Sequence, residues 1–290
     1  MHRLGRIAAM AATGMLLAGG VRAELAKPWQ LGMSPPASTS MADIVWMHDF
    51  LLIIITLITL FVLALLIVVM VRFNEKANPV PTKTTHNTLL EIAWTGIPVL
   101  ILVVIAVPSL KLVYFLDRTE EPEVTLKVTG NQWYWNYEYP DENAGFSFDS
   151  VLIPEENLKA DQIRLLSVDN PVVLPIETNI RVLTTAADVI HSWALPQLIY
   201  KVDSVPGRTN ESWMRITREG TFYGQCSELC GVNHGYMPIV VQAVSKQAYQ
   251  QWLTRAKTTF AAIDDNRPAA KAATDDVTPK TGPVALAAGN

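Results

Sequence analysis

The chain has 290 residues, of which 50% are hydrophobic and 17% charged, with a formal net charge of -4. This length is enough for one or two domains with a sizeable core, but the composition is apolar for a purely soluble protein. The negative net charge gives no reason to expect a nucleic-acid partner, and two cysteines are too few for a disulfide scaffold.

Residues 1–23 have the pattern of an export signal. A basic start containing Arg3 and Arg6 precedes an apolar stretch from Ile7 to Leu17, and small residues lead to a predicted cut after Ala23. An uncleaved anchor is the alternative, but the apolar stretch is shorter than the roughly 20 residues that a span needs. Residues 24–49 are then expected to form an outer segment.

Residues 50–72 are predicted to form the first transmembrane helix. Phe50–Val71 contains no charge, and at about 1.5 Å per residue it crosses a hydrocarbon core of about 30 Å. Trp46 lies where interfacial aromatic residues are common, and Arg72 closes the stretch. A soluble helical hairpin is disfavoured because this stretch has no polar face.

Residues 89–115 are predicted to form the second transmembrane helix, although Pro98 and Pro108 lie inside it. Proline is tolerated in a membrane helix when neighbouring groups satisfy the freed carbonyls, which favours packing against other protein. Glu91 lies near its start. That acid could simply interact favourably with the positive end of the helix dipole. The alternative is a functional role at the membrane edge, because a charge near a span is costly unless it serves a function.

The connecting loop, residues 73–88, is predicted to be cytoplasmic. Lys76 and Lys83 lie in it and Arg72 borders it, whereas only Lys27 lies between the predicted cut and the first span. The positive-inside rule therefore places both termini, and everything after about Leu116, on the oxidising side.

Residues 116–256 are predicted to form an all-β domain, because short β-rich runs alternate with proline and glycine. This pattern is typical of a β-sandwich or barrel. A short helix is expected over 247–256, and the tail 257–290 has the composition of a disordered segment. The runs expected to be strands are Val124–Val128, Gln132–Tyr139, Ile163–Val168, Asn179–Leu183, Met214–Ile216, Thr221–Tyr223 and Ile239–Val244.

The domain is also acidic. Between Asp117 and Arg255 acidic residues outnumber basic ones. Such a face would steer a basic partner, although it is equally compatible with an ordinary solvated surface.

Both cysteines lie in one loop with the spacing Cys226-x3-Cys230-x3-His234-x2-Met237. His191 follows another strand-like region and is expected at the end of that strand. Thiolate, imidazole and thioether together are the ligand set of copper electron-transfer sites. A disulfide would leave the histidines and the methionine unexplained, and a zinc site would not need Met237. Copper is therefore favoured over both alternatives.

A single thiolate would indicate a mononuclear blue-copper site. Two thiolates can bridge two coppers, with His191 and His234 as terminal ligands. Met237 would then be the weak axial ligand of one copper, and a loop carbonyl, best that of Glu228, the weak ligand of the other. Sharing one electron between two metals keeps bond-length changes small.

These motifs resemble subunit II of haem-copper cytochrome c oxidases of the bacterial type. The resemblance covers about Trp29 to Trp252 and includes the two-span hairpin. Its specific motifs are Gly130-Asn-Gln-Trp-Tyr-Trp135, Asp188-Val-Ile-His-Ser-Trp193, Val205-Pro-Gly-Arg208 and Tyr223-Gly-Gln-Cys-Ser-Glu-Leu-Cys-Gly-Val-Asn-His234.

The resemblance implies a cupredoxin-like β-domain on a transmembrane hairpin. It also implies a binuclear copper A centre on His191, Cys226, the Glu228 carbonyl, Cys230, His234 and Met237. The Glu228 side chain would face a magnesium ion shared with subunit I. Electrons from cytochrome c would enter at Trp133 and Tyr134. Glu138, Asp149 and Asp188 would contact the donor, and Glu91 would lie at the mouth of a proton path linked to proton translocation.

The function implied is the electron-entry subunit of a terminal respiratory oxidase, with no haem and no oxygen-reducing site on this chain. Its partners would be cytochrome c, subunit I, other oxidase subunits and the lipid bilayer of the bacterial inner membrane, with the copper domain in the periplasm. Complete copper ligands argue against the related quinol oxidases. The alternative from another class is a membrane-tethered copper-binding or thiol-disulfide module.

Overall fold

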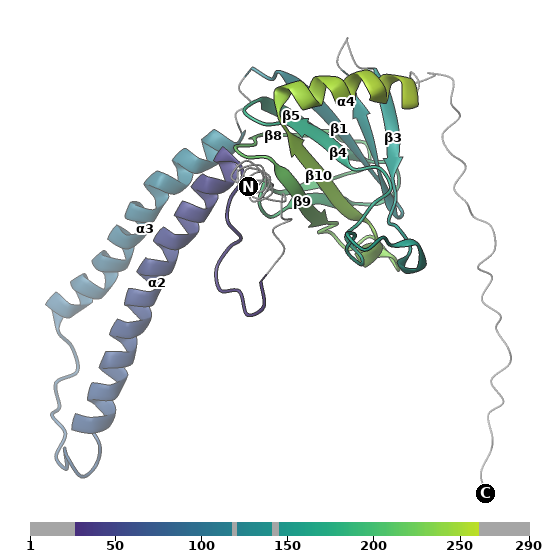
Figure 1. The fold of residues 1–290 in the computed structure, drawn as a ribbon. Coiled ribbons are helices and arrows are strands. Elements are labelled where there is room, and N and C mark those ends of the chain that lie inside the picture. Colours follow the sequence, from purple (N-terminus) through teal and green to yellow (C-terminus); the bar gives the residue numbers. More distant parts are fainter. Residues whose placement is uncertain (1–26, 118–120, 141–144, 261–290) are drawn as a thin grey trace, which may run out of the picture.

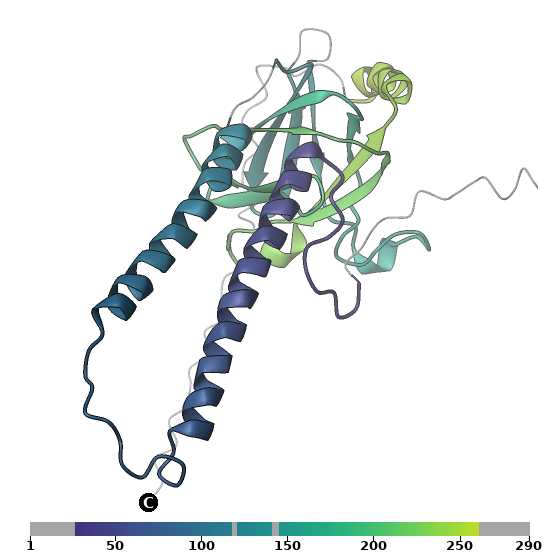
Figure 2. The same ribbon diagram turned by 90° about the vertical axis from the view of Figure 1, so that its left-hand side faces the viewer.

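Two long helices lie side by side and lead away from one side of a β-domain (Figures 1 and 2). The computed structural model describes residues 27–117, 121–140 and 145–260. Helix α2 spans Thr39–Arg72 and helix α3 spans Thr88–Asp117. The predicted signal peptide, 1–23, and most of the predicted tail, 257–290, lie outside the described residues.

Helix α2 begins earlier than the sequence analysis expected. The Ser38 side chain caps it by accepting a hydrogen bond from the Met41 backbone N–H at 3.1 Å. No proline or glycine lies between Thr39 and Phe50, so nothing interrupts the helix before the apolar stretch. The helical boundary predicted at Phe50 is therefore wrong, and residues 39–49 of the predicted outer segment are helical.

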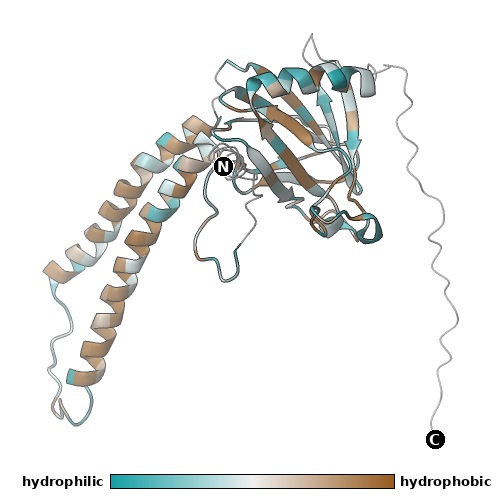
Figure 3. Ribbon diagram, in the orientation of Figure 1, coloured by the Kyte–Doolittle hydropathy of each residue, from teal (hydrophilic) through white to brown (hydrophobic). Residues whose placement is uncertain are grey.

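Helix α3 agrees with its predicted bounds to within two residues at each end. Asn87 caps it, because its Oδ1 atom accepts hydrogen bonds from the backbone N–H groups of Leu89 and Leu90. Hydrophobic residues make up most of both helices (Figure 3), and many of them are exposed. By length and composition, each helix can cross a membrane.

The β-domain contains a five-stranded sheet ordered β3-β2-β1-β5-β8, a three-stranded sheet ordered β4-β10-β9, and the pair β6-β7. β1 pairs with β5, and β4 with β10, in parallel, whereas the other neighbours are antiparallel. The strands are β1 (Val124–Asn131), β2 (Tyr134–Tyr139), β3 (Phe146–Ser150), β4 (Val172–Pro175), β5 (Asn179–Ala186), β6 (His191–Leu195), β7 (Ile199–Ser204), β8 (Asn210–Arg215), β9 (Gly220–Gln225) and β10 (Pro238–Val244).

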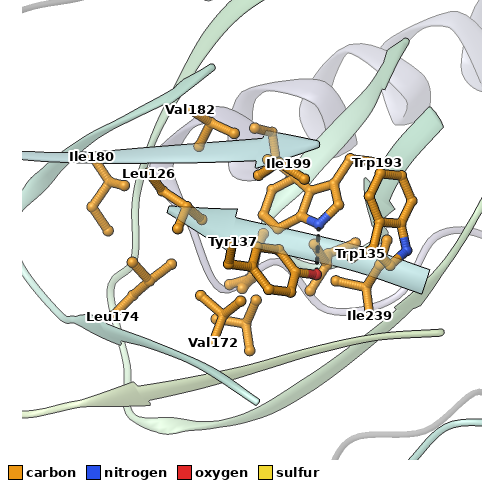
Figure 4. Close-up of a cluster of buried hydrophobic side chains, with 14 of the residues drawn as sticks. Leu126, Trp135, Tyr137, Val172, Leu174, Ile180, Val182, Trp193, Ile199 and Ile239 are labelled. Atoms are coloured by element: carbon orange, nitrogen blue, oxygen red, sulfur yellow. Dashed lines mark hydrogen bonds between the residues drawn. The ribbon is translucent and has the colours of Figure 1, made fainter. Parts of the chain in front are cut away.

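Large side chains fill the space between the sheets (Figure 4). Trp135, Tyr137 and Trp193 are fully buried, and the indole N–H of Trp193 donates to the Tyr137 hydroxyl at 3.2 Å. That bond satisfies the only polar atom that each of these two side chains brings into the core. The predicted β-domain following a hairpin of two apolar helices is confirmed.

The sequence analysis was wrong about some strands. Ile163–Val168 is not a strand, because the backbone N–H groups of Leu166 and Ser167 both donate to the Ile163 carbonyl and close a turn. The strand predicted from Gln132 begins at Tyr134. The strands β3, β4, β6 and β7 were not predicted.

The last helix, α4 (Lys246–Thr259), is longer than predicted. Ser245 caps its start by accepting from the Ala248 backbone N–H. Beyond its end, the Phe260 ring stacks on Phe148 with a centroid separation of 4.6 Å. Residues 257–260 therefore belong to the folded domain, and the prediction that disorder begins at 257 is wrong.

The helical hairpin is joined to the β8 side of the domain. The Trp213 indole N–H donates to the Phe115 carbonyl at 3.0 Å, and the two rings pack edge to face. At the start of α2, the Ser38 hydroxyl donates to the Leu198 carbonyl at 2.6 Å. These contacts hold the β-domain at the ends of the two helices (Figure 1).

Candidate metal centre

The segment Cys226–Met237, called the ligand loop below, joins β9 to β10. The two strands are antiparallel, and Gln225 pairs directly with Pro238, so the sheet closes the base of the loop. Cys226 and Met237 are therefore brought together by strand register. His234 lies in a short 3-10 helix within the loop.

Six donor groups meet at this loop in two sets. The Cys226 Sγ atom lies 3.9 Å from His191 Nδ1 and 3.4 Å from the Glu228 carbonyl oxygen. The Cys230 Sγ atom lies 3.6 Å from His234 Nδ1 and 3.5 Å from Met237 Sδ. Each thiol is thus accompanied by one imidazole nitrogen and one weaker donor.

The two sulfur atoms are 3.9 Å apart and are not bonded to each other. Cys226, Cys230 and Met237 are at most 5% exposed, and His191 is fully buried. Buried thiols and imidazoles need partners, and here the partners are chiefly one another. His191 lies at the start of β6, whereas the sequence analysis expected it at the end of a strand.

This donor set fits a pair of copper ions better than zinc. His191, Cys226 and Cys230 offer ligand atoms within 4.8 Å of one another, which is close enough for shared metal ions. A structural zinc ion takes four strong donors, which would leave the buried Met237 thioether and the Glu228 carbonyl unused. Copper accepts thiolate, imidazole and a weak axial thioether or carbonyl together.

Gly130 makes room for the His191 imidazole. A Cβ atom at this position would lie 2.8–2.9 Å from three side-chain atoms of His191. Trp135 packs edge-on against the same ring at a centroid separation of 5.9 Å, and its indole N–H donates to the Met237 carbonyl at 3.2 Å. Strands β1 and β2 therefore hold ligands from two different segments.

Trp133 lies against the ligand loop, beside Gln132. The Trp133 indole N–H and the Gln132 side-chain amide both donate to the Cys230 carbonyl, at 3.2 and 2.8 Å. Gly231 has a positive φ of 120°, and a Cβ atom there would be 3.0 Å from the Trp133 ring. Glycine thus permits both the backbone turn and the close approach of the indole.

The surroundings of the two thiols push their pKa values in opposite directions. Burial raises the pKa of Cys226, but hydrogen bonds to His191 and to the backbone at Glu228 and Ser192 outweigh it and lower that pKa. Burial, reinforced by the neighbouring Cys226, raises the pKa of Cys230. Of the two thiols, Cys226 is therefore the one whose ionised form its surroundings favour.

Asp188 was predicted to be a docking acid, but its carboxylate contacts a predicted ligand. Its Oδ1 atom lies 2.8 Å from His191 Nε2. Burial raises the pKa of Asp188, yet hydrogen bonds from His191 and from the backbone outweigh it and lower the pKa. Burial lowers the pKa of His191, and its bonds to Cys226 and Asp188 raise it overall.

The other two predicted docking acids lie away from the ligands. Glu138 forms an ion pair with Lys127 at 2.8 Å across the β1-β2 pair. Asp149 on β3 accepts a hydrogen bond from the Asn136 side chain at 2.7 Å. Asp149 contributes to a raised pKa of Tyr134, for which burial is the larger cause.

The Glu228 side chain forms an ion pair with Lys201 at 2.7 Å. Lys201 also lies 3.7 Å from Asp203. Glu91 lies far from all of these residues, in the first turn of α3, at the end of the hairpin remote from the β-domain (Figure 1).

Some residues that shape the site were not singled out from the sequence. Gly130 and Gln132 belong to a recognised motif but were given no separate role. The Asp188-x-x-His191 spacing was the one available signal that the acid could reach the imidazole. Lys201 carried no signal, because its partner Glu228 lies 27 residues away.

Comparison with known proteins identifies relatives along most of the chain. The family model "Cytochrome C oxidase subunit II, periplasmic domain" matches residues 124–244, and "Cytochrome C oxidase subunit II, transmembrane domain" matches residues 26–112. The probable cytochrome c oxidase subunit 2 of Rickettsia bellii (strain RML369-C) is 53% identical over 239 residues, covering 82% of this chain and 88% of the relative. Cytochrome c oxidase subunit 2 of Phytophthora megasperma is 51% identical over 235 residues, covering 79% and 88%.

Among solved structures, the periplasmic domain of subunit II of cytochrome oxidase of Bradyrhizobium japonicum is 46% identical, with a TM-score of 0.46. That alignment covers 50% of this chain and 100% of the solved one.

Proposed function

The chain belongs to the cytochrome c oxidase subunit II family, and on that premise we propose that it is the electron-entry subunit of a terminal respiratory oxidase. It takes electrons from cytochrome c and passes them to haem in subunit I, where oxygen is reduced to water. The observation that carries the proposal is the meeting of two thiols, two imidazoles, a thioether and a carbonyl at the ligand loop. When bound there, two copper ions supply a one-electron relay.

The protein holds these donors on stiff elements. β9 and β10 fix the two ends of the ligand loop, and β6 supplies His191. Gly224 on β9 lets this strand approach β6, because a Cβ atom there would collide with the Ala194 carbonyl oxygen. A stiff cage suits electron transfer, because little must rearrange when the charge changes.

Electrons enter at Trp133, with Tyr134 beside it. The Trp133 indole N–H is bonded to the Cys230 carbonyl, so one hydrogen bond separates the aromatic ring from the main chain of a ligand. Asp149 is the best placed of the predicted docking acids, because Asp188 contacts His191 and Glu138 is paired with Lys127, whereas Asp149 on β3 accepts a hydrogen bond from a neutral amide. A donor with a basic rim would meet this acid and the exposed part of Tyr134.

The helical hairpin anchors the subunit in the bacterial inner membrane, with the β-domain on the periplasmic side. The cationic loop between the helices supports this orientation. Glu91, at the cytoplasmic end of α3, is then placed to feed protons into subunit I. Its carboxylate is at the membrane edge, where an acid needs water or a partner.

A magnesium ion at the contact with subunit I would take the Glu228 carboxylate as a ligand. The carboxylate is 41% exposed and paired with Lys201. Lys201 could turn to Asp203, from which it is already only 3.7 Å distant. Carboxylate oxygen is the ligand type that magnesium prefers.

The test uses the full chain in detergent, loaded with copper. Metal content would be measured by elemental mass spectrometry, the spin by electron paramagnetic resonance, and electron uptake by rapid mixing with reduced cytochrome c. We expect two coppers per chain, one unpaired electron shared between them in the oxidised centre and lost when one electron is taken up, and fast uptake. The double variant Cys226→Ser/Cys230→Ser should lose all three.

Two results would contradict the proposal. One zinc or one copper per chain would exclude the binuclear relay. Sulfurs that cycle between thiol and disulfide while copper is passed on to another protein would instead indicate the thiol-disulfide or metal-delivery module. Mass spectrometry before and after mild reduction separates that outcome.

A further inference from the structure

The His191 imidazole is fully buried, and each of its two ring nitrogens faces one group. Nδ1 faces Cys226 at 3.9 Å, and Nε2 faces Asp188 Oδ1 at 2.8 Å. An ionised carboxylate can only accept hydrogen bonds, so the proton must lie on Nε2. Nδ1 is then the ring nitrogen that faces the ligand loop and would bind a metal there.

The Asp188 carboxylate uses both oxygens in this arrangement. Oδ1 also accepts from the Val189 backbone N–H at 2.6 Å, and Oδ2 accepts from the Gln132 backbone N–H at 2.7 Å. Its side chain is only 32% exposed. Three donors from three residues hold the carboxylate in one orientation, which leaves it little freedom to contact a docking partner.

The bond to Gln132 links Asp188 to the other half of the site. Gln132 and Trp133 both donate to the Cys230 carbonyl. The Ala187 backbone N–H, next to Asp188, donates to the Gly130 carbonyl at 3.0 Å. The turn between β1 and β2 is thereby fastened to the residues preceding β6 on one side and to the ligand loop on the other.

We propose that Asp188 is a positioning residue of the metal centre, which fixes the tautomer and orientation of His191 and holds the Trp133 turn against the same site. The inference rests on the proposed function, because it gives Asp188 a purpose only if His191 is a ligand. It replaces the docking role predicted for Asp188. Docking is left to acids such as Asp149, which has no contact with a ligand.

The first test uses the natural full chain, free of copper and labelled with nitrogen-15 at histidine. We expect nuclear magnetic resonance to show one imidazole, that of His191, with a slowly exchanging proton on Nε2. An Nε2 without a proton, or an Nε2 proton that exchanges at the rate of a free imidazole, would overturn the proposal. This readout does not depend on copper, so it distinguishes failure of this inference from failure of the proposed function.

The second test compares copper affinity in three variants by competition with a chelator. Asp188→Ala should weaken copper binding about 10- to 100-fold, the usual effect of removing a partner behind a metal ligand. Asp188→Asn keeps an oxygen that can accept from Nε2 and should recover most of that affinity. The matched control Asp149→Ala removes an acid from the same domain and should leave affinity and the spin spectrum unchanged.

Three outcomes would overturn the assignment. One is an Asp188→Ala chain that binds copper with natural affinity and an unchanged reduction potential but binds cytochrome c weakly. Another is an Asp188→Asn chain that binds copper as weakly as Asp188→Ala, because charge rather than orientation would then be responsible. The third is an Asp149→Ala chain with the same loss of affinity. If circular dichroism shows that Asp188→Ala does not fold, the asparagine variant and the proton on Nε2 decide the question.

Discussion

Gly130 offers a direct test of how tightly the metal centre is packed. The Gly130→Ala substitution adds one methyl group to β1, at a position whose φ is not in the left-handed region. The backbone therefore accepts alanine, and the effect comes from the contact with His191 alone. The added Cβ would lie 2.8 Å from the ring, whereas ordinary contacts begin near 3.4 Å.

The ring must move by roughly 0.6 Å to relieve this contact, or the strands must separate. Neither change is easy, because the imidazole is fully buried, bonded to Asp188 and packed on Trp135. Overpacking of this kind costs about 1–3 kcal/mol in the free energy of unfolding. Any part of that displacement that carries Nδ1 away from the Cys226 thiol also weakens copper binding.

The assay is chemical denaturation of the copper-free chain, followed by copper titration of the folded chain. Gly235→Ala is the matched control, because it lies in the ligand loop, has no positive φ and has no atom within 4 Å of the added Cβ. We expect Gly130→Ala to lose stability and copper affinity, and Gly235→Ala to lose little of either. Equal behaviour of the two variants would refute the argument that the β1 backbone sets the place of His191.

Met237→Leu conserves volume at a residue that is 1% exposed, so it should keep the fold and most of the copper but change the reduction potential of the copper centre. The control Met214→Leu, in the core, should leave that potential unchanged. An unchanged potential in both variants would remove Met237 from the site. Trp133→Phe loses one polar contact, the hydrogen bond to the Cys230 carbonyl, and should slow electron uptake at constant copper content. The control Trp213→Phe loses a similar hydrogen bond to the Phe115 carbonyl and should leave electron uptake unchanged. Copper at 100 times the dissociation constant of a site should stabilise the chain by about 2.7 kcal/mol for each copper bound, seen as a rise in melting temperature that a chelator reverses. Glu91→Gln in the assembled oxidase should slow turnover without changing the rate of electron uptake from cytochrome c.

The sequence predicted the architecture well where one strong signal dominated. Long apolar stretches indicated both helices, and the β-rich run Asn179–Leu183 indicated a strand that is present as part of β5. Boundaries failed where a local cap decided them, as at Ser38, because capping depends on one side chain and not on a pattern. Ile163–Val168 failed because its apolar residues fold into a turn that periodicity does not reveal.

The candidate ligands could be selected from spacing, because five of the six predicted donor residues lie within one loop. Their grouping into two sets, Cys226 with His191 and Cys230 with His234, depends on how β6 lies against β9, and no local pattern contains that information. The same limit applies to Asp188. Its charge was visible in the sequence, but its contact with His191 depends on the turn before β6.

The supports around the site explain why its parts must act together. The Cys230 carbonyl accepts from Trp133 and Gln132, Gln132 donates its backbone N–H to Asp188, and Asp188 accepts from His191. This sequence of hydrogen bonds runs from one ligand segment to the other without passing through a metal ion. Displacement of Gln132 or Asp188 would disturb both the aromatic entry point and the imidazole, because these two residues link the supports of both. Electron uptake and copper affinity should therefore fall together in variants of Gln132 and Asp188, whereas they separate in Trp133→Phe.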